Sequence, residues 1–295
     1  MIHNRLCSGL KVMLVVLVFS GLLEDAKGIT LVEKLYINRD SMEMVTGDKL
    51  PYLVFNRSTN FEQQNAVLEL AVGDTLDLWI INTDTATHGF QIKSIMGTSL
   101  SIPAGDSVHL VQEFSNEGVY IYHDPQQYPY NLYLGLGGMI YVKNHLHERF
   151  YWNMKEHASN WNTTLVNGGT VSLNNYKPDY FTINGNSHPD INADSTARIE
   201  GNVGDTLILC IANTGRGIHS IHFHGYHAEI LYSSKHSHHV GRSKDTFPIY
   251  PMETLELRLV PDKPGEYPVH DHNLVAISAN SIYPNGMFST ILIAP

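Results

Sequence analysis

Short apolar runs rich in Val, Ile, Leu, Tyr and Thr recur along the chain from residue 29 onward, as in Leu207-Ile-Leu-Cys-Ile211. Turn sequences such as Pro103-Ala-Gly-Asp106 and Pro264-Gly265 separate these runs. Little of the chain shows the 3.6-residue period of an amphipathic helix. Short strands joined by Gly- and Pro-containing turns are typical of an antiparallel β-sandwich, so the pattern predicts an all-β fold.

The chain also repeats itself. The segments Val72-Gly-Asp-Thr-Leu76, Ile81-Asn-Thr83 and His88 return, 131 residues later, as Val203-Gly-Asp-Thr-Leu207, Ala212-Asn-Thr214 and His219. Further along, Gly118-Val-Tyr-Ile-Tyr-His123-Asp124 matches Gly265-Glu-Tyr-Pro-Val-His270-Asp271, with a longer offset. We therefore predict two copies of one domain, over residues 29–144 and 181–295. Residues 145–180 are less regular and form the predicted connection, with a short helix.

Residues 1–28 have the features of a secretory signal peptide. Arg5 and Lys11 precede the apolar run 12–23, and Ala26-Lys-Gly28 offers a small-residue cleavage site. A membrane anchor is the alternative, although about a dozen apolar residues are short for a bilayer span. We expect a secreted protein, either extracellular or periplasmic.

Cysteine content and charge narrow the class of protein. Cys7 lies in the predicted signal, which leaves Cys210 alone and excludes a disulfide within the mature chain. The formal net charge of −10, with 17 histidines uncounted, argues against nucleic acid as a partner. Asn56-Arg-Ser58 and Asn162-Thr-Thr164 match the N-glycosylation pattern, which matters only in a eukaryotic source.

Two histidine clusters carry the candidate chemistry. His219-Ser-Ile-His222-Phe-His224 and His270-Asp-His272 are separated by about 45 residues of strand-like sequence. Because side chains alternate between the faces of a strand, each His-x-His pair shares one face. Two such strands side by side would bring four imidazoles together. Imidazole suits copper, zinc, nickel and iron, so the residues alone predict a metal site without choosing the metal.

The second copy resembles the terminal cupredoxin domain of the multicopper oxidases. The matching segments, in order, are Thr182-Ile-Asn-Gly185, Val203-Gly-Asp205, His219–Gly225, Asp245-Thr246, Pro264-Gly265 and His270-Asp-His272, the last where the family has His-Cys-His. The first copy is similar to the leading domain of copper nitrite reductases and small laccases. The resemblance implies two tandem cupredoxin-like Greek-key β-sandwich domains with copper as the cofactor.

The resemblance also implies roles for single residues. His219 falls on a type 1 copper ligand, whereas His222, His224, His270 and His272 fall on ligands of type 2 and type 3 copper. In the first copy His123 matches one further ligand, but Pro125 replaces its partner. His88 has two alignments: the family's first His-x-His makes it a type 2 ligand, and the internal repeat equates it with His219.

The type 1 copper itself is not expected in either domain. Asp271 and Asp124 stand where the thiolate ligand is needed, and a carboxylate cannot reproduce that short bond. Ala276 and Asn131 stand at the spacing of a second type 1 histidine. The two aspartates are either buried hydrogen-bonding replacements or ligands of a new mononuclear site with His88 or His219.

Two classes of function follow. One is a copper-dependent oxidoreductase in which a small-molecule reductant reduces copper directly, oxygen, peroxide or nitrite is the acceptor, and Asp271 relays protons. The other is a non-catalytic protein for copper storage or delivery, or a structural protein. The resemblance further implies a homotrimer in which His123 faces the second-domain histidines of a neighbour. His236, His238 and His239 either bind metal adventitiously or form a solvated loop.

Overall fold

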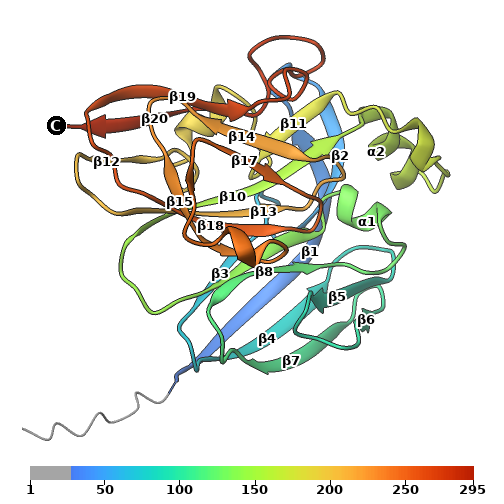
Figure 1. The fold of residues 1–295 in the computed structure, drawn as a ribbon. Coiled ribbons are helices and arrows are strands. Elements are labelled where there is room, and N and C mark those ends of the chain that lie inside the picture. Colours follow the sequence, from blue (N-terminus) through green and yellow to red (C-terminus); the bar gives the residue numbers. More distant parts are fainter. Residues whose placement is uncertain (1–27) are drawn as a thin grey trace, which may run out of the picture.

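The computed structural model describes residues 28–295, in which two β-sandwich domains pack against each other (Figure 1). The predicted secretory signal therefore lies outside the described residues, except for Gly28. Among residues 28–295 no helix is both long and apolar enough to cross a bilayer. The prediction of two tandem cupredoxin-like Greek-key β-sandwich domains is confirmed.

The first domain is built from strands β1 to β9. One sheet has the order β2-β1-β4-β7, and the other has the order β3-β9-β8-β5-β6. The strands are β1 (Thr30–Glu43), β2 (Lys49–Asn56), β3 (Val67–Leu70), β4 (Thr75–Asn82), β5 (His88–Ile92), β6 (Leu100–Ile102), β7 (Ser107–Glu113), β8 (Gly118–His123) and β9 (Gly137–Val142). Alternate side chains of β4, Leu76, Leu78 and Ile80, are fully buried between the sheets. The short helix α1 (Tyr130–Tyr133) links β8 to β9.

The second domain repeats this plan with β10 to β20. Its sheets have the orders β11-β10-β13-β18-β15-β16 and β12-β20-β19-β14-β17. The strands are β10 (Glu148–His157), β11 (Tyr180–Ile183), β12 (Glu200–Asn202), β13 (Leu207–Asn213), β14 (His219–Phe223), β15 (Ala228–Ser233), β16 (Ser243–Lys244), β17 (Thr246–Ile249), β18 (Thr254–Leu259), β19 (Gly265–Asp271) and β20 (Phe288–Ala294). The 3₁₀ turns are η1 (Leu173–Asn175), η2 (Asp190–Ala193) and η3 (Ser237–His239).

The strand pairing differs from the expected antiparallel sandwich in a regular way. Each domain has mixed sheets, because β1 runs parallel to β4 and, in the second copy, β10 runs parallel to β13. β3–β9 and β12–β20 are also parallel. Parallel partners are far apart in the sequence, and alternation of side chains does not record the direction of a neighbouring strand.

The predicted connection over residues 145–180 needs a correction. Residues 148–157 form β10, which pairs with β13 and β11 and so belongs to the second domain. All of its residues from Phe150 to His157 are buried, so the strand lacks the alternation that reveals a half-exposed strand. The expected short helix is present as α2 (Ser159–Val166).

A shared core joins the two domains. Val119, Ile121 and Met139 of the first domain pack with Ile208 and Cys210 of the second. Polar contacts cross the same boundary: Tyr141 donates to the buried carboxylate of Glu256 (3.0 Å), and Thr254 donates to the carbonyl of Val119 (2.7 Å). The placement of Cys210 in this core confirms that it packs as a small buried residue.

Candidate metal centre

The pairing of β14 with β19 brings the two histidine clusters together. His222 lies directly opposite His270 in the register, and one residue pair away Ile221 lies opposite Asp271. The ring centroids of His222 lie 4.7 Å from those of His224, 5.9 Å from His270 and 5.7 Å from His272. The four imidazoles therefore converge at one place, as the alternation of side chains predicted.

Hydrogen bonds orient two of these rings for binding. The Nδ1–H of His270 donates to the carbonyl oxygen of Asp271 (2.8 Å). The hydroxyl of Thr246 donates to Asp245, so its oxygen accepts the Nδ1–H of His222 (2.9 Å). Both rings are thereby held in the tautomer that leaves Nε2 with its lone pair free. Such outer contacts are a usual means of orienting histidine ligands.

The spacing of the donor atoms fits a small metal ion in part. The Nε2 atoms of His224 and His270 lie 3.0 Å apart, a separation that two ligands can have when each is about 2.0 Å from one ion. His222 and His270 are half-buried, whereas His224 and His272 are exposed at the surface. Within residues 28–295, however, no three His, Cys, Asp or Glu side chains already stand as one ligand set. Binding at this cluster, His222, His224, His270 and His272, thus requires rotation of exposed rings or a further ligand from outside the chain.

The electrostatics at His224 favour a neutral ring. Partial burial, together with the neighbouring imidazoles of His270 and His222, lowers the pKa of His224. Imidazole must be deprotonated at the coordinating nitrogen to bind metal, so a lowered pKa extends binding to lower pH.

In the second domain, the position of the type 1 copper is filled by a buried trio of side chains. His219 lies between two carboxylates, with Nδ1 2.6 Å from Oδ2 of Asp271 and Nε2 3.1 Å from Oε2 of Glu156. The other oxygen of Asp271 accepts the amides of Ser220 and Asn273. Burial alone would lower the pKa of His219. The hydrogen bonds to Asp271 and Glu156 outweigh burial and raise this pKa to about 9. The ring is therefore an imidazolium with no free lone pair at neutral pH.

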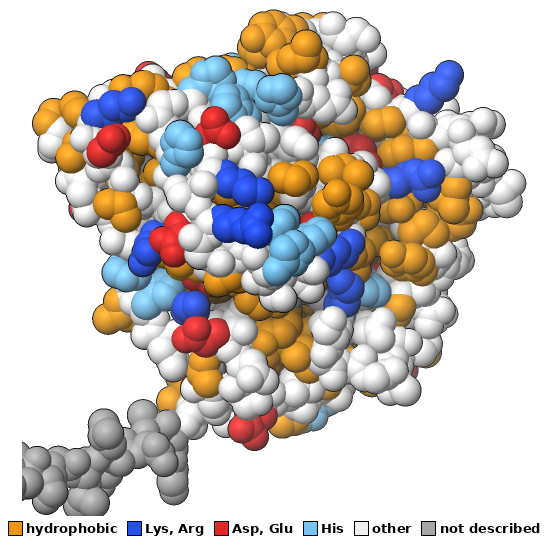
Figure 2. All heavy atoms as spheres, in the orientation of Figure 1, with side chains coloured by type: hydrophobic (Ala, Val, Ile, Leu, Met, Phe, Trp, Pro, Cys, Tyr) orange, Lys and Arg blue, Asp and Glu red, His pale blue; other side chains and the backbone are white. Residues whose placement is uncertain are grey.

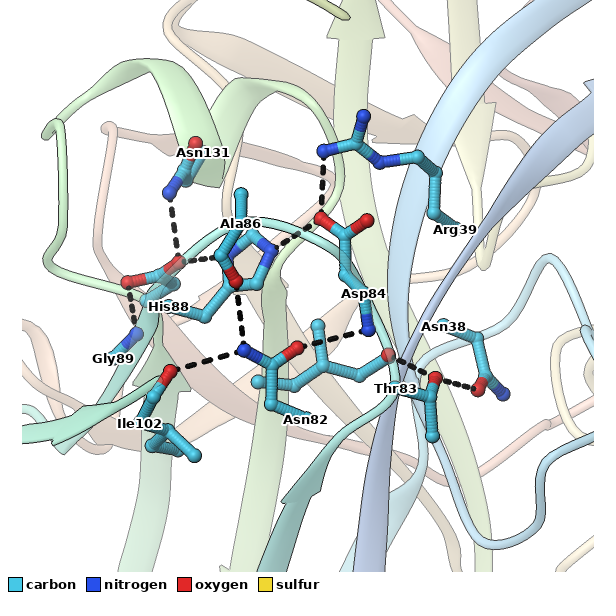
Figure 3. Close-up of polar contacts among 12 residues, drawn as sticks. Asn38, Arg39, Asn82, Thr83, Asp84, Ala86, His88, Gly89, Ile102 and Asn131 are labelled. Atoms are coloured by element: carbon cyan, nitrogen blue, oxygen red, sulfur yellow. Dashed lines mark hydrogen bonds and ion pairs between the residues drawn. The ribbon is translucent and has the colours of Figure 1, made fainter. Parts of the chain in front are cut away.

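The first domain has the same arrangement, drawn in Figure 3. Nδ1 of His88 lies 2.7 Å from Oδ2 of Asp124, and Nε2 lies 2.7 Å from Oδ2 of Asp84. Asn131 donates to Asp124, and Arg39 donates to Asp84 (2.6 Å). Burial alone would lower the pKa of His88, but the hydrogen bonds to the two carboxylates raise it. The hydrogen bond from His88 in turn keeps the pKa of Asp84 low, at about 2, although burial acts in the opposite direction.

These two trios settle several expectations. Asp124 and Asp271 are buried hydrogen-bonding replacements, because both ring nitrogens of His88 and of His219 are already engaged and neither ring can also bind a metal. His88 occupies the place equivalent to His219, as the internal repeat indicated, and His88 and His219 both drop out of the ligand set. Asp271 is fully buried against His219, so the structure does not support it as a proton relay.

His123 lies apart from the four clustered imidazoles within one chain. It ends β8, is buried, and its Nδ1 has no hydrogen-bond partner in the described part of the chain. Burial lowers the pKa of His123, so the ring is neutral. A buried polar atom without a partner is costly, so this nitrogen calls for an explanation beyond packing.

The sequence did not reveal the second carboxylate of each trio. Asp84 lies four residues before His88, a spacing that could have drawn attention, but Glu156 lies in the segment predicted as a connection. Thr246 was noted only as part of the resemblance, although its oxygen orients His222.

The structure also bears on two minor expectations. Asn56 and Asn162 are buried, and their amide groups donate to backbone carbonyls of Glu62 and Pro51, so the folded protein leaves no room for a glycan on either. His236 is held by the buried carboxylate of Glu253 (2.8 Å) and is not freely solvated, unlike the exposed His238.

Comparisons with known proteins agree with the fold and the family. A blue copper oxidase from Nitrosomonas europaea is 21% identical, with a TM-score of 0.77 and coverage of 90% of this chain and 86% of that one. The multicopper oxidase mgLAC is 19% identical (TM-score 0.74; 91% and 88% covered), and a copper nitrite reductase from Nitrosomonas europaea is 17% identical (TM-score 0.72; 90% and 94% covered). At this identity the three likenesses establish a shared two-domain cupredoxin fold.

The family itself comes from a sequence model. Residues 161–287 match the family model described as multicopper oxidase. The predicted resemblance is confirmed, and copper, the metal in the family's description, is consistent with the imidazole cluster. No curated protein sequence matches the chain.

Proposed function

We propose that this protein binds copper through His222, His224, His270 and His272, and that it is an oxidoreductase that works without type 1 copper. The observation that carries the proposal is the convergence of these four rings, two of them oriented by Thr246 and by the carbonyl of Asp271. The family of the second domain and the copper oxidases and nitrite reductase among its structural neighbours support copper over zinc, nickel or iron.

The residues define what the site can do. Copper supplies one-electron redox chemistry when bound. His222 and His270 hold fixed positions on adjacent strands, whereas His224 and His272 lie at the surface, where a small reductant and oxygen or nitrite could reach the metal. Because the trios fill both type 1 positions, electrons must come directly from the substrate.

A second candidate is a non-catalytic copper protein for storage or delivery. The specific observation in its favour is that both positions for an electron-donating copper are blocked by carboxylates. The exposed position of the cluster suits transfer of the metal equally well.

Two further parts of the proposal concern assembly and location. We propose a homotrimer in which His123 faces the four-histidine cluster of a neighbouring chain, in keeping with the incomplete ligand set of a single chain. We also propose export from the cytoplasm, on the pattern of residues 1–28.

Metal analysis and electron paramagnetic resonance on the copper-loaded protein test the central claim. We expect bound copper with the signal of nitrogen ligands and no intense blue band, and loss of copper in the double variant His222→Ala and His272→Ala. The matched control is His238→Ala, an exposed histidine away from the cluster. Copper binding that the double variant leaves unchanged would refute the site.

Oxygen consumption separates the two functions. Steady uptake with a phenol, ascorbate or a reducing metal ion, abolished by the double variant, would establish the oxidoreductase. Copper bound tightly without turnover of oxygen, peroxide or nitrite would establish the storage or delivery role.

A further inference from the structure

Four basic side chains gather on one surface at the boundary between the domains. They are Lys93 from the first domain and Lys235, Arg242 and Lys244 from the second, and within residues 28–295 none of them forms an ion pair. Figure 2 shows Lys, Arg and His side chains gathered in the middle of this face, around the place that η3 has in Figure 1. An uncompensated positive surface is unexpected on a chain with a net charge of −10.

Two of these lysines are held close together. Nζ of Lys93 donates to the carbonyl of Met252 (2.6 Å), and Nζ of Lys235 donates to the adjacent carbonyl of Pro251 (2.6 Å). Partial burial, and then the charge of Lys235, lowers the pKa of Lys93. The fold thus holds two ammonium groups from different domains near each other although they repel.

The carboxylate of Glu253 offsets part of this positive charge and acts to raise the pKa of Lys93, but it forms no ion pair with either lysine. Glu253 is fully buried, and its oxygens already accept hydrogen bonds from Ser233, His236 and the amide of Tyr250. Each ammonium group donates one hydrogen bond to a neutral carbonyl and keeps two donors free.

A pocket of about 140 Å³ lies at the domain boundary, and of the four basic residues Lys93 lines it. The lining contains no carboxylate, and its polar side chains are those of Lys93, Ser94, Tyr120, Tyr232, Ser234 and Thr254. The hydroxyl oxygen of Ser234 accepts the amide of Thr254, which leaves the hydroxyl proton available as a donor. Since a water molecule occupies about 30 Å³, the pocket has room for one small polyatomic anion and a few waters.

We propose that this pocket binds a tetrahedral oxyanion, a phosphate or sulfate group, with Lys93 and Lys235 as its principal cations. The ammonium group of Lys93 in the lining, the charge of Lys235 close to it and the hydroxyl of Ser234 match the several acceptor oxygens of such a group. The anion would relieve the repulsion between the two lysines and would tie the first domain to the second. The site is separate from the four-histidine cluster, and the proposal does not depend on copper.

Isothermal titration of the metal-free protein with sodium sulfate and with sodium phosphate, at constant ionic strength, tests the proposal. We expect saturable binding of one anion per chain, together with a higher melting temperature than in sodium chloride. Lys235→Gln, at an exposed position, should weaken binding about tenfold or more, because a hydrogen bond to a charged group contributes roughly 1.5–3 kcal/mol. Lys93→Gln should do the same, and Lys93→Arg should retain binding if the glutamine variant does not fold.

Lys49→Gln is the matched control, since Lys49 is an exposed lysine on β2. Equal weakening by Lys49→Gln and Lys235→Gln, or equal stabilisation by chloride, would overturn the proposal in favour of general charge screening. A third titration, with a sugar phosphate, identifies the source of the group. Tighter binding than inorganic phosphate assigns an esterified phosphate, and weaker binding assigns the free ion.

Discussion

At the scale of single residues, the two trios show how a cupredoxin position can be stable without its metal. His219 with Asp271 joins β14 to β19, and His88 with Asp124 joins β5 to the end of β8, so each pair links two strands. A buried charge is tolerable only when it is paired and hydrogen-bonded, and here every carboxylate of the trios has partners. The substitution of cysteine by aspartate therefore exchanges a metal ligand for a structural ion pair.

The first prediction tests this structural role. Asp271→Ala should lower the free energy of unfolding by about 3–5 kcal/mol, because Nδ1 of the buried imidazolium and the amides of Ser220 and Asn273 all lose their acceptor. Asp124→Ala should have an effect of similar size in the first domain. Urea unfolding at pH 7 measures both, with Asp271→Asn as the control that keeps an acceptor and should cost less. Losses below about 1 kcal/mol would show that the trios are not structural.

The second prediction concerns pH. The pKa of His219 is about 9 in the folded protein against 6.5 ordinarily, so its stabilising contribution is fully present below about pH 6.5 and disappears as pH rises through 9. The difference in unfolding free energy between the wild type and His219→Gln should therefore shrink by about 3 kcal/mol over that interval. Because other groups titrate in the same way in both proteins, their contributions cancel in the difference between the two unfolding free energies. A difference that stays constant with pH would contradict the raised pKa.

At the scale of elements, register and strand order decide where the chemistry lies. The pairing of His222 with His270 sets all four rings on one side of β14 and β19, and a shift by one residue would turn each His-x-His pair inward. β10 has a comparable importance because it supplies Glu156 to the trio and pairs with β13 along its length. The second domain therefore begins with β10, ahead of α2 in the chain.

The third prediction follows from the pairing of β10 with β13 in the second domain. A fragment of residues 148–295 should unfold cooperatively in urea, whereas a fragment of residues 181–295 should not, because it lacks β10 and leaves β13 with an unpaired edge and Glu156 absent. Circular dichroism and urea unfolding of the two fragments make the comparison. A shorter fragment as stable as the longer one would show that β10 is dispensable.

At the scale of the whole molecule, the two domains act as one body around the core that contains Ile208 and Cys210. Within this body His123 does not join the four-histidine cluster, so any site that uses both must be shared between chains. A five-histidine site would therefore need an assembly such as the homotrimer proposed above.

The fourth prediction is complementation between two defective chains. His123→Ala alone, and His222→Ala with His272→Ala, should each bind less copper than the wild type. When the two proteins are mixed and reassembled, part of the binding should return, because an intact His123 then faces an intact cluster. Copper content and sedimentation of the mixture measure this result. A monomer at all concentrations, or a mixture no better than its components, would refute the shared site.

The sequence by itself determined the duplicated β-sandwich, the resemblance of the second domain to the multicopper oxidases and the clustering of four imidazoles. These are properties of local alternation, of repeated motifs and of two His-x-His pairs, which a chain carries whatever its neighbours are. It also showed that Asp124 and Asp271 stand where a thiolate is needed.

Only the tertiary structure decided what the aspartates do. Asp84 and Glu156 reach His88 and His219 through contacts that the fold creates, and Glu156 comes from a fully buried strand that has no alternation to reveal it. The same holds for the parallel strand pairs and for the meeting of Lys93 with Lys235. Contacts between distant segments depend on packing of the whole chain, and local sequence patterns do not encode them.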